Sequence, residues 1–146
     1  MKEKILDTFK TLGFDLELLQ DMGYGFEYEG KRFIYLYDDD DQEFLNIALP
    51  VMLEMQDEND IVYYKMMDKL NVSLKYVKAN LCFGGLWMFY ERELFGGEDL
   101  KEVISHMILR LEAGFTFLCR MKAEEDHDDD TNDAEDADTD CREDAA

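Results

Sequence analysis

The chain has 146 residues, 47% of them hydrophobic, which is enough for one domain with a real core. Its 36 acidic and 15 basic residues give a formal net charge of −21, which argues against binding nucleic acid or an anionic membrane, because both need a basic surface. No apolar run approaches the roughly 18 residues that span a bilayer, and the N-terminus lacks the pattern of a secretory signal.

The cysteines agree with a reducing compartment. Cys82, Cys119 and Cys141 are an odd number at unrelated spacings, so they predict neither a disulfide framework nor a metal site. We therefore expect a cytoplasmic protein.

The chain begins with a pattern typical of a short surface helix. Over residues 3–12, apolar side chains recur at helical spacing, and lysines and acidic residues occupy the other side. Gly13 is expected to end this helix. Residues 14–19 alternate only weakly, so they predict an irregular extended segment.

A meander of three strands is predicted next. The turns between them are Glu29-Gly30 and the acidic run Asp38–Asp41. Pro50 is expected to limit the third strand, because proline has no N–H for the hydrogen-bonded ladder. The strands cover Tyr24–Glu29, Lys31–Tyr37 and Glu43–Leu49.

The second half of the chain predicts a helix, a hairpin and another helix. The first helix is expected from about Glu58 to Leu70, with Asp57 as its N-cap. Two apolar runs joined by Gly84-Gly85 indicate a hairpin, because a type I′ turn needs positive φ at both central residues. The hairpin strands cover Tyr76–Phe83 and Leu86–Phe95, and the last helix covers Glu98 to about Lys122.

The C-terminal segment, residues 123–146, differs from the rest of the chain. It holds 13 acidic residues against Arg142 alone, a local net charge of −12, and no aromatic or branched aliphatic residue. Such a composition cannot bury enough apolar surface to offset the entropy of ordering. We expect one domain over residues 1–122 and a disordered acidic tail over residues 123–146.

The predicted element order is α-β-β-β-α-β-β-α. Strands linked by hairpins within each group favour a mainly antiparallel sheet, and helices before, between and after them can pack on it. The fold class is therefore α+β, a two-layer sandwich with its helices on one face of the sheet.

Several strands are apolar on both faces, although helices on one side cover only one of them. In the hairpin, Trp87 and Phe89 alternate with Leu86 and Met88, so one set must face outward. An apolar face left uncovered more often marks an interface than a solvated surface. The alternative is that the helix at residues 58–70, or a curled sheet, covers it within the monomer. The candidate face for protein binding or dimerisation comprises Trp87, Phe89, Tyr35 and Tyr37.

No motif for catalysis, metal binding or cofactor binding is present. Asp38–Asp41 fails the EF-hand pattern, because Glu43 and Leu49 stand where glycine and glutamate are required. His106 has no partner motif that would make it a general base, and Glu91 and Glu93 are expected to be surface charges. We therefore predict no cofactor and no enzymatic activity.

Four stretches of the chain are familiar when taken together: Tyr28–Lys31, Phe44–Pro50, the segment from Leu70-Asn71 to Lys75–Ala79, and Glu93–Gly97. They resemble bacterial YbjN-like proteins, which are described as candidate sensory transduction regulators and whose fold is similar to that of type III secretion chaperones. The resemblance covers roughly residues 1–122 and implies a small protein-binding or chaperone-like module, often dimeric, with no shared catalytic residues.

The leading hypothesis is a non-enzymatic protein-interaction module, expected as a homodimer. Its apolar sheet face would serve self-association or hold a client segment, with the acidic surface selecting basic clients. The alternative is a charge-based regulator that binds basic protein partners through its acidic tail.

Overall fold

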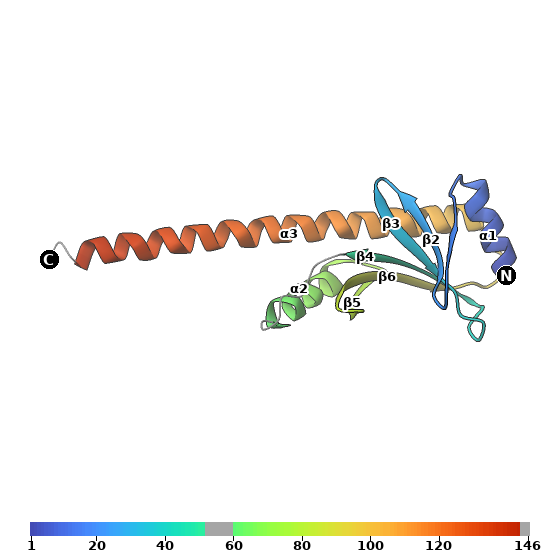
Figure 1. The fold of residues 1–146 in the computed structure, drawn as a ribbon, viewed down its shortest axis with the longest axis horizontal. Coiled ribbons are helices and arrows are strands. Elements are labelled where there is room, and N and C mark those ends of the chain that lie inside the picture. Colours follow the sequence, from blue (N-terminus) through green and yellow to red (C-terminus); the bar gives the residue numbers. More distant parts are fainter. Residues whose placement is uncertain (52–59, 144–146) are drawn as a thin grey trace. The chain divides into compact units, whose positions relative to one another are not determined.

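The computed structural model describes residues 1–51 and 60–143, and in them it forms three helices and one six-stranded antiparallel sheet (Figure 1). The strands lie in the order β1-β2-β3-β4-β6-β5, which confirms the predicted α+β class and the antiparallel sheet. In chain order the elements are α1 (Lys2–Thr11), β1 (Glu17–Leu19), β2 (Gly23–Tyr28), β3 (Lys31–Leu36), β4 (Phe44–Val51), α2 (Asp60–Ser73), β5 (Val77–Cys82), β6 (Gly85–Glu93) and α3 (Leu100–Glu143).

One strand was missed by the sequence analysis. The segment expected to be irregular contains β1, so the order is α-β-β-β-β-α-β-β-α. β1 pairs with β2 from Glu17↔Gly25 to Leu19↔Gly23, and the Glu17 side chain forms an ion pair with Arg32 of β3 across the intervening strand. Three residues are too few to show an alternating pattern in sequence. The expected N-cap at Asp57 and helix start at Glu58 lie outside the described residues.

The expectation that Pro50 limits the third strand was wrong. β4 continues to Val51, and Pro50 pairs with Trp87 of β6. On its other side, β4 pairs with β3 only from Asn46 to Ala48. Pro50 lies beyond that pairing, where no strand needs its missing N–H, and proline is tolerated at such edge positions.

The turn of the β5–β6 hairpin is shifted by one residue from the predicted one. Cys82 pairs with Gly85, so the central residues are Phe83 and Gly84, with φ of 50° and 75°. Both values are in the left-handed region that a type I′ turn requires. Gly85 belongs to β6, and a phenylalanine occupies a position that normally favours asparagine or glycine.

One face of the sheet carries the core. Partners in register share a face, which places Phe26, Tyr35 and Met88 on the same side. α1 covers this side through Phe9, whose ring centroid lies 4.9 Å from that of Phe26 and 5.6 Å from that of Tyr35. The start of α3 covers it at Gly114, where an added Cβ would lie 3.1 Å from the Met88 sulfur, so glycine allows the helix to approach closely.

The chain divides into two compact units, residues 1–114 and 115–146. The first contains α1, the whole sheet, α2 and the beginning of α3, and the second contains the rest of α3. α3 is helical to Glu143, beyond the end expected near Lys122. No glycine or proline follows Gly114, so the sequence after it contains no helix breaker.

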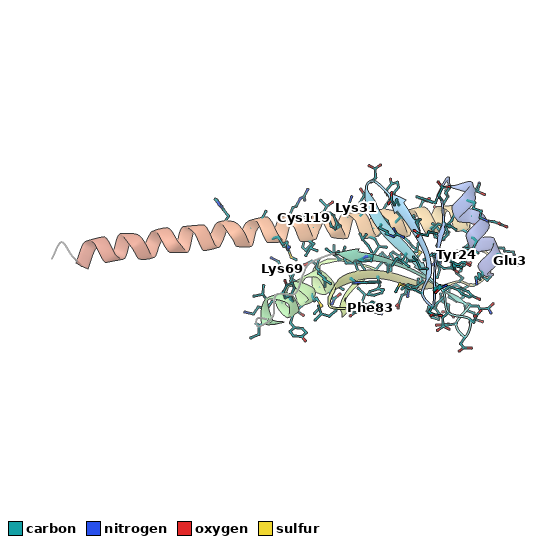
Figure 2. All side chains as sticks on the ribbon, in the orientation of Figure 1. Glu3, Tyr24, Lys31, Lys69, Phe83 and Cys119 are labelled. Carbon is teal, nitrogen blue, oxygen red and sulfur yellow. The ribbon has the colours of Figure 1, made fainter. Side chains whose placement is uncertain are left out.

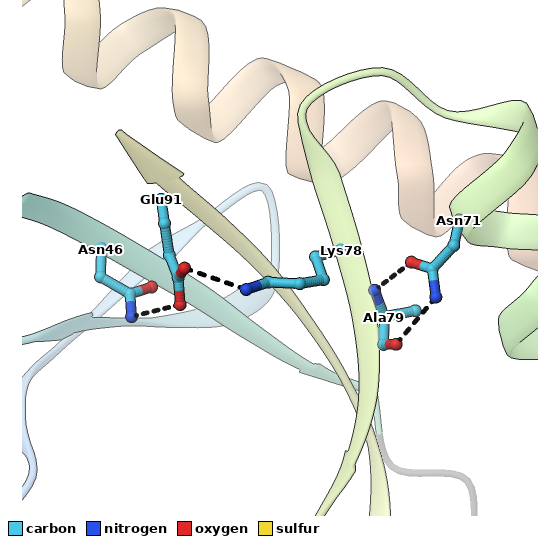
Figure 3. Close-up of polar contacts among 5 residues, drawn as sticks. All are labelled: Asn46, Asn71, Lys78, Ala79 and Glu91. Atoms are coloured by element: carbon cyan, nitrogen blue, oxygen red, sulfur yellow. Dashed lines mark hydrogen bonds and ion pairs between the residues drawn. The ribbon is translucent and has the colours of Figure 1, made fainter. Parts of the chain in front are cut away.

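Asn71 of α2 satisfies the outer edge of β5. Its side-chain oxygen accepts a 2.7 Å hydrogen bond from the Ala79 N–H, and its side-chain nitrogen donates a 3.1 Å hydrogen bond to the Ala79 carbonyl (Figure 3). β5 is the last strand of the sheet, so these backbone groups would otherwise be open to a further strand. The Asn71 clamp therefore attaches α2 to the sheet and closes its edge at this point.

Replacing Asn71 with alanine should lower the free energy of unfolding by about 1–2 kcal/mol, because two hydrogen bonds to a buried residue are lost. The gain in helix propensity offsets only about 0.5 kcal/mol of this. Urea unfolding measures the change, and Asn80→Ala on the same strand is the control, expected to have little effect. Equal losses in the two variants would contradict the role of the clamp.

The acidic part of α3, residues 123–143, is helical in the structure, but we predict that it frays in solution, since charge repulsion within it opposes the helix and no apolar stripe holds it in place. Hydrogen exchange monitored by mass spectrometry should show full deuteration of these residues at the earliest time point. α1 and the strands should stay protected in the same sample. Slow exchange beyond Lys122 would contradict the predicted disorder.

Candidate protein-binding face

Trp87 and Phe89 lie on the face of the sheet opposite to the core. On β6 they alternate with Leu86 and Met88, which are fully buried. Both aromatic residues are only half-buried, and Trp87 pairs with Pro50. The side chains of this second face, hereafter the open face, point away from the side that α1 and the start of α3 cover.

Three aromatic rings run along the open face. The Phe83 ring centroid lies 5.4 Å from that of Trp87, and the Trp87 centroid lies 6.1 Å from that of Phe89. Phe83 stands at the tip of the hairpin and is 79% exposed (Figure 2). These three residues, the aromatic ladder, form a continuous apolar strip that is accessible to a partner.

The other two candidate residues are not part of the aromatic ladder, although Tyr37 lines a hollow together with Trp87 and Phe89. Tyr35 belongs to the core face and is 1% exposed, and its burial, followed by the neighbouring Tyr37 and Tyr24, raises the pKa of its hydroxyl. It therefore contributes nothing to the open face. Tyr37, just beyond β3, donates a 2.8 Å hydrogen bond to Asp39, and this bond raises the pKa of Tyr37. The structure thus brings Trp87 and Phe89 together and separates Tyr35 from them.

The open face is hollowed beside the aromatic ladder. A hollow of about 440 Å³ is lined by apolar residues together with the acidic residues Asp21, Asp38, Asp41 and Glu91. No lysine or arginine is among the described residues that line it. We call this the acidic hollow. Its remaining lining residues are Met22, Leu36, Tyr37, Phe44, Asn46, Cys82, Phe83, Trp87 and Phe89.

A second hollow lies on the other side of Phe89, between α2 and the edge strand β5. Its volume is about 680 Å³, and it is lined by Tyr64 and Met67 of α2 together with the outer residues of β5. Phe89 and Cys82 line both hollows, so the two hollows adjoin at these residues.

A polar row crosses the open face next to the ladder. Glu91 accepts a 3.2 Å hydrogen bond from the side-chain amide of Asn46 and a 3.0 Å hydrogen bond from the Lys78 ammonium (Figure 3). The row joins β4, β6 and β5. The Asn46 side-chain oxygen is buried and has no hydrogen-bond partner among the described residues.

The sequence analysis missed Phe83, because it was assigned to the end of a strand instead of a turn. The position of the turn follows from the strand register: because Cys82 pairs with Gly85, the two-residue loop consists of Phe83 and Gly84. The sequence alone does not contain this register. Asp38 and Asp41 were interpreted only as part of a solvated turn, yet they line the acidic hollow. Their proximity to Trp87 depends on the packing of separate strands, which local sequence does not show.

Residues considered for catalysis are not gathered into a site. His106 is exposed on α3, and Glu91 and Glu93 lie on one exposed face of β6. In the described part of the chain, no three histidine, cysteine or acidic side chains are grouped to hold a metal ion. Within the same part, none of the helices has the length and apolar character to cross a membrane.

Comparison with known proteins gives a result at the level of fold. No family model and no curated protein matches the sequence. Among solved structures, YbjN from E. coli, named as a proposed transcription regulator, is similar with a TM-score of 0.60 and 10% identity over 81% of this chain and 87% of that one. The chain has a YbjN-like fold.

Two further structures share this YbjN-like fold. An uncharacterized protein from Methanothermobacter thermautotrophicus matches with a TM-score of 0.59 and 16% identity over 82% of this chain and 94% of its own. A chain of the HopA1–SchA chaperone–effector complex matches with a TM-score of 0.52 and 12% identity, covering 79% and 91%. The likeness therefore confirms the similarity to secretion chaperones that the sequence analysis expected of the fold.

Replacing Phe83 with asparagine should raise the free energy of unfolding by about 0.5–1 kcal/mol, because asparagine tolerates positive φ and a bulky residue does not. The small loss of contact with Trp87 is included in this range. Phe44→Asn is the control, since Phe44 is exposed on β4 without positive φ, and that variant should be destabilised. Thermal and urea unfolding measure both. Destabilisation by Phe83→Asn would show that the turn favours phenylalanine after all.

Proposed function

We propose that this chain is a non-enzymatic, chaperone-like module that holds a segment of a partner protein on its open face. The observation that carries the proposal is the aromatic ladder of Phe83, Trp87 and Phe89, which lies half-buried to exposed on the face of the sheet opposite to the core. Aromatic side chains arranged in this way supply large contact areas at low cost in side-chain entropy.

Phe83 supports a role in binding, because its position is unfavourable for folding alone. A phenylalanine at positive φ costs backbone energy, and one that is largely exposed recovers little of it through burial. Residues that break local rules without a gain in the folded chain are concentrated at functional sites. An interface that buries Phe83 would supply the missing gain.

The edge of the sheet is less suited to binding than its face. A partner that adds a strand to β5 would have to displace Asn71 from the Ala79 backbone groups. β1, at the other edge, is three residues long. Partner contacts through side chains on the open face therefore agree better with the structure than strand addition.

The structural neighbours agree with this proposal. One of them is a chain of a chaperone–effector complex, which is a protein that binds another protein. The homodimer and the cytoplasmic location expected from the sequence belong to the same proposal. The acidic segment 123–146 offers a second way to bind basic proteins, and we keep it as the alternative because its net charge is −12.

The test uses full-length protein and peptides selected from a displayed random library. Trp87→Ser/Phe89→Ser should weaken binding of the selected peptides by more than about 30-fold, because two central aromatic contacts are removed. Phe95→Ser is the matched control, since Phe95 is 81% exposed and lines neither hollow. Circular dichroism and thermal unfolding establish that all variants are folded.

Unchanged affinity in the double variant, or failure to select any peptide, would refute the proposed function. Light scattering after size-exclusion chromatography measures the oligomeric state in parallel. A dimer that dissociates in Trp87→Ser/Phe89→Ser but not in Phe95→Ser would make a second copy the occupant of the face, in place of a client segment.

A further inference from the structure

Resting on the proposed function, we infer the chemical class of the partner: a protein segment that inserts an apolar side chain into the acidic hollow and carries lysine or arginine beside it. The inference follows from two independent properties of the hollow, the apolar residues and the acidic residues that line it. Each property selects one part of the occupant.

The apolar residues of the acidic hollow favour an apolar side chain in the occupant. They include Met22, Leu36, Phe44, Trp87 and Phe89. Its volume of about 440 Å³ is within the range of roughly 300–1,000 Å³ that is typical of ligand-binding clefts. A polar side chain would lose its hydration here without finding enough hydrogen-bond partners.

The lining of the acidic hollow requires positive charge close to that apolar anchor. Four acidic residues line it, and among the described residues only Glu91 of these four forms an ion pair, with Lys78. The remaining three are Asp21, Asp38 and Asp41, which come from two separate loops. Cations on the occupant would meet these carboxylates beside an apolar surface, where attraction is stronger than in bulk water.

The same charges disfavour a second copy of this chain as occupant. In a two-fold symmetric dimer, the same patch occurs on both partners, so the carboxylates of one hollow would face those of the other. They likewise disfavour nucleic acid and anionic lipid. A cationic segment with an apolar anchor is the occupant that matches both the apolar and the acidic residues of the hollow.

The experiment measures binding of synthetic peptides to the full-length protein. Three labelled peptides of about 12 residues share the same apolar positions and differ only in carrying lysine, serine or glutamate at the others. Fluorescence anisotropy gives the affinity. Trp87, the only tryptophan in the chain, reports by its own fluorescence whether binding takes place at the hollow.

We expect the lysine peptide to bind at least about tenfold more tightly than the glutamate peptide and to weaken as salt rises to about 0.3 M. The triple variant Asp21→Asn/Asp38→Asn/Asp41→Asn should reduce its affinity at least about fivefold, since complementary charge is lost. The matched control is Asp128→Asn/Asp129→Asn/Asp130→Asn, which changes the net charge equally in the acidic segment and should cost less than about twofold.

The outcomes separate the inference from the proposed function. Equal binding of the lysine and glutamate peptides, with a change in Trp87 fluorescence, would contradict the inference that the partner is cationic. The proposal that the open face binds a protein segment would still stand. Equal losses in the two triple variants would overturn the hollow as the site and favour the acidic segment. No binding by any peptide, including those selected from the library, would refute the proposed function itself.

Discussion

The pairing of β4 with β6 decides which hairpin side chains are buried and which are exposed. It extends over eight partners, from Phe44↔Glu93 to Val51↔Leu86, and joins the β1–β4 meander to the β5–β6 hairpin. A slip by one residue would place Trp87 and Phe89 in the core and expose Leu86 and Met88, because side chains alternate between the two faces. The core and the open face therefore depend on one register.

The turn at Phe83-Gly84 specifies the pairing of β5 with β6. A two-residue loop with positive φ at both positions allows one pairing, Cys82↔Gly85, and all other partners of β5 follow from it. Phe83 thus belongs to both the turn and the aromatic ladder. The backbone strain is accepted at the position where the ring is available to a partner, as expected where binding and folding impose different demands.

Much of the fold was predictable, because long apolar periodicities and glycine turns identified the helices, most strands and the antiparallel sheet. The predictions that were wrong concern features that depend on how the strands pair. β1 is too short to show alternation, and Pro50 continues a strand because the pairing of β4 with β3 stops at Ala48. The turn lies at Phe83-Gly84 because the register overrides the local preference for glycine. Alternation on β6 predicted that Trp87 and Phe89 would share a face. The approach of Asp21 and Asp38 to that face required long-range packing, which no local pattern contains.

The Asn71 clamp has a consequence for how this chain behaves at high concentration. A sheet with an apolar surface is at risk of growing sideways, since each open edge can template the next molecule. Here one edge has its Ala79 backbone groups occupied from within, and the other ends in a three-residue strand that carries Glu17. The molecule thus exposes aromatic side chains on the face of a sheet whose edge is blocked at Ala79, and this reduces the tendency to extend into fibrils.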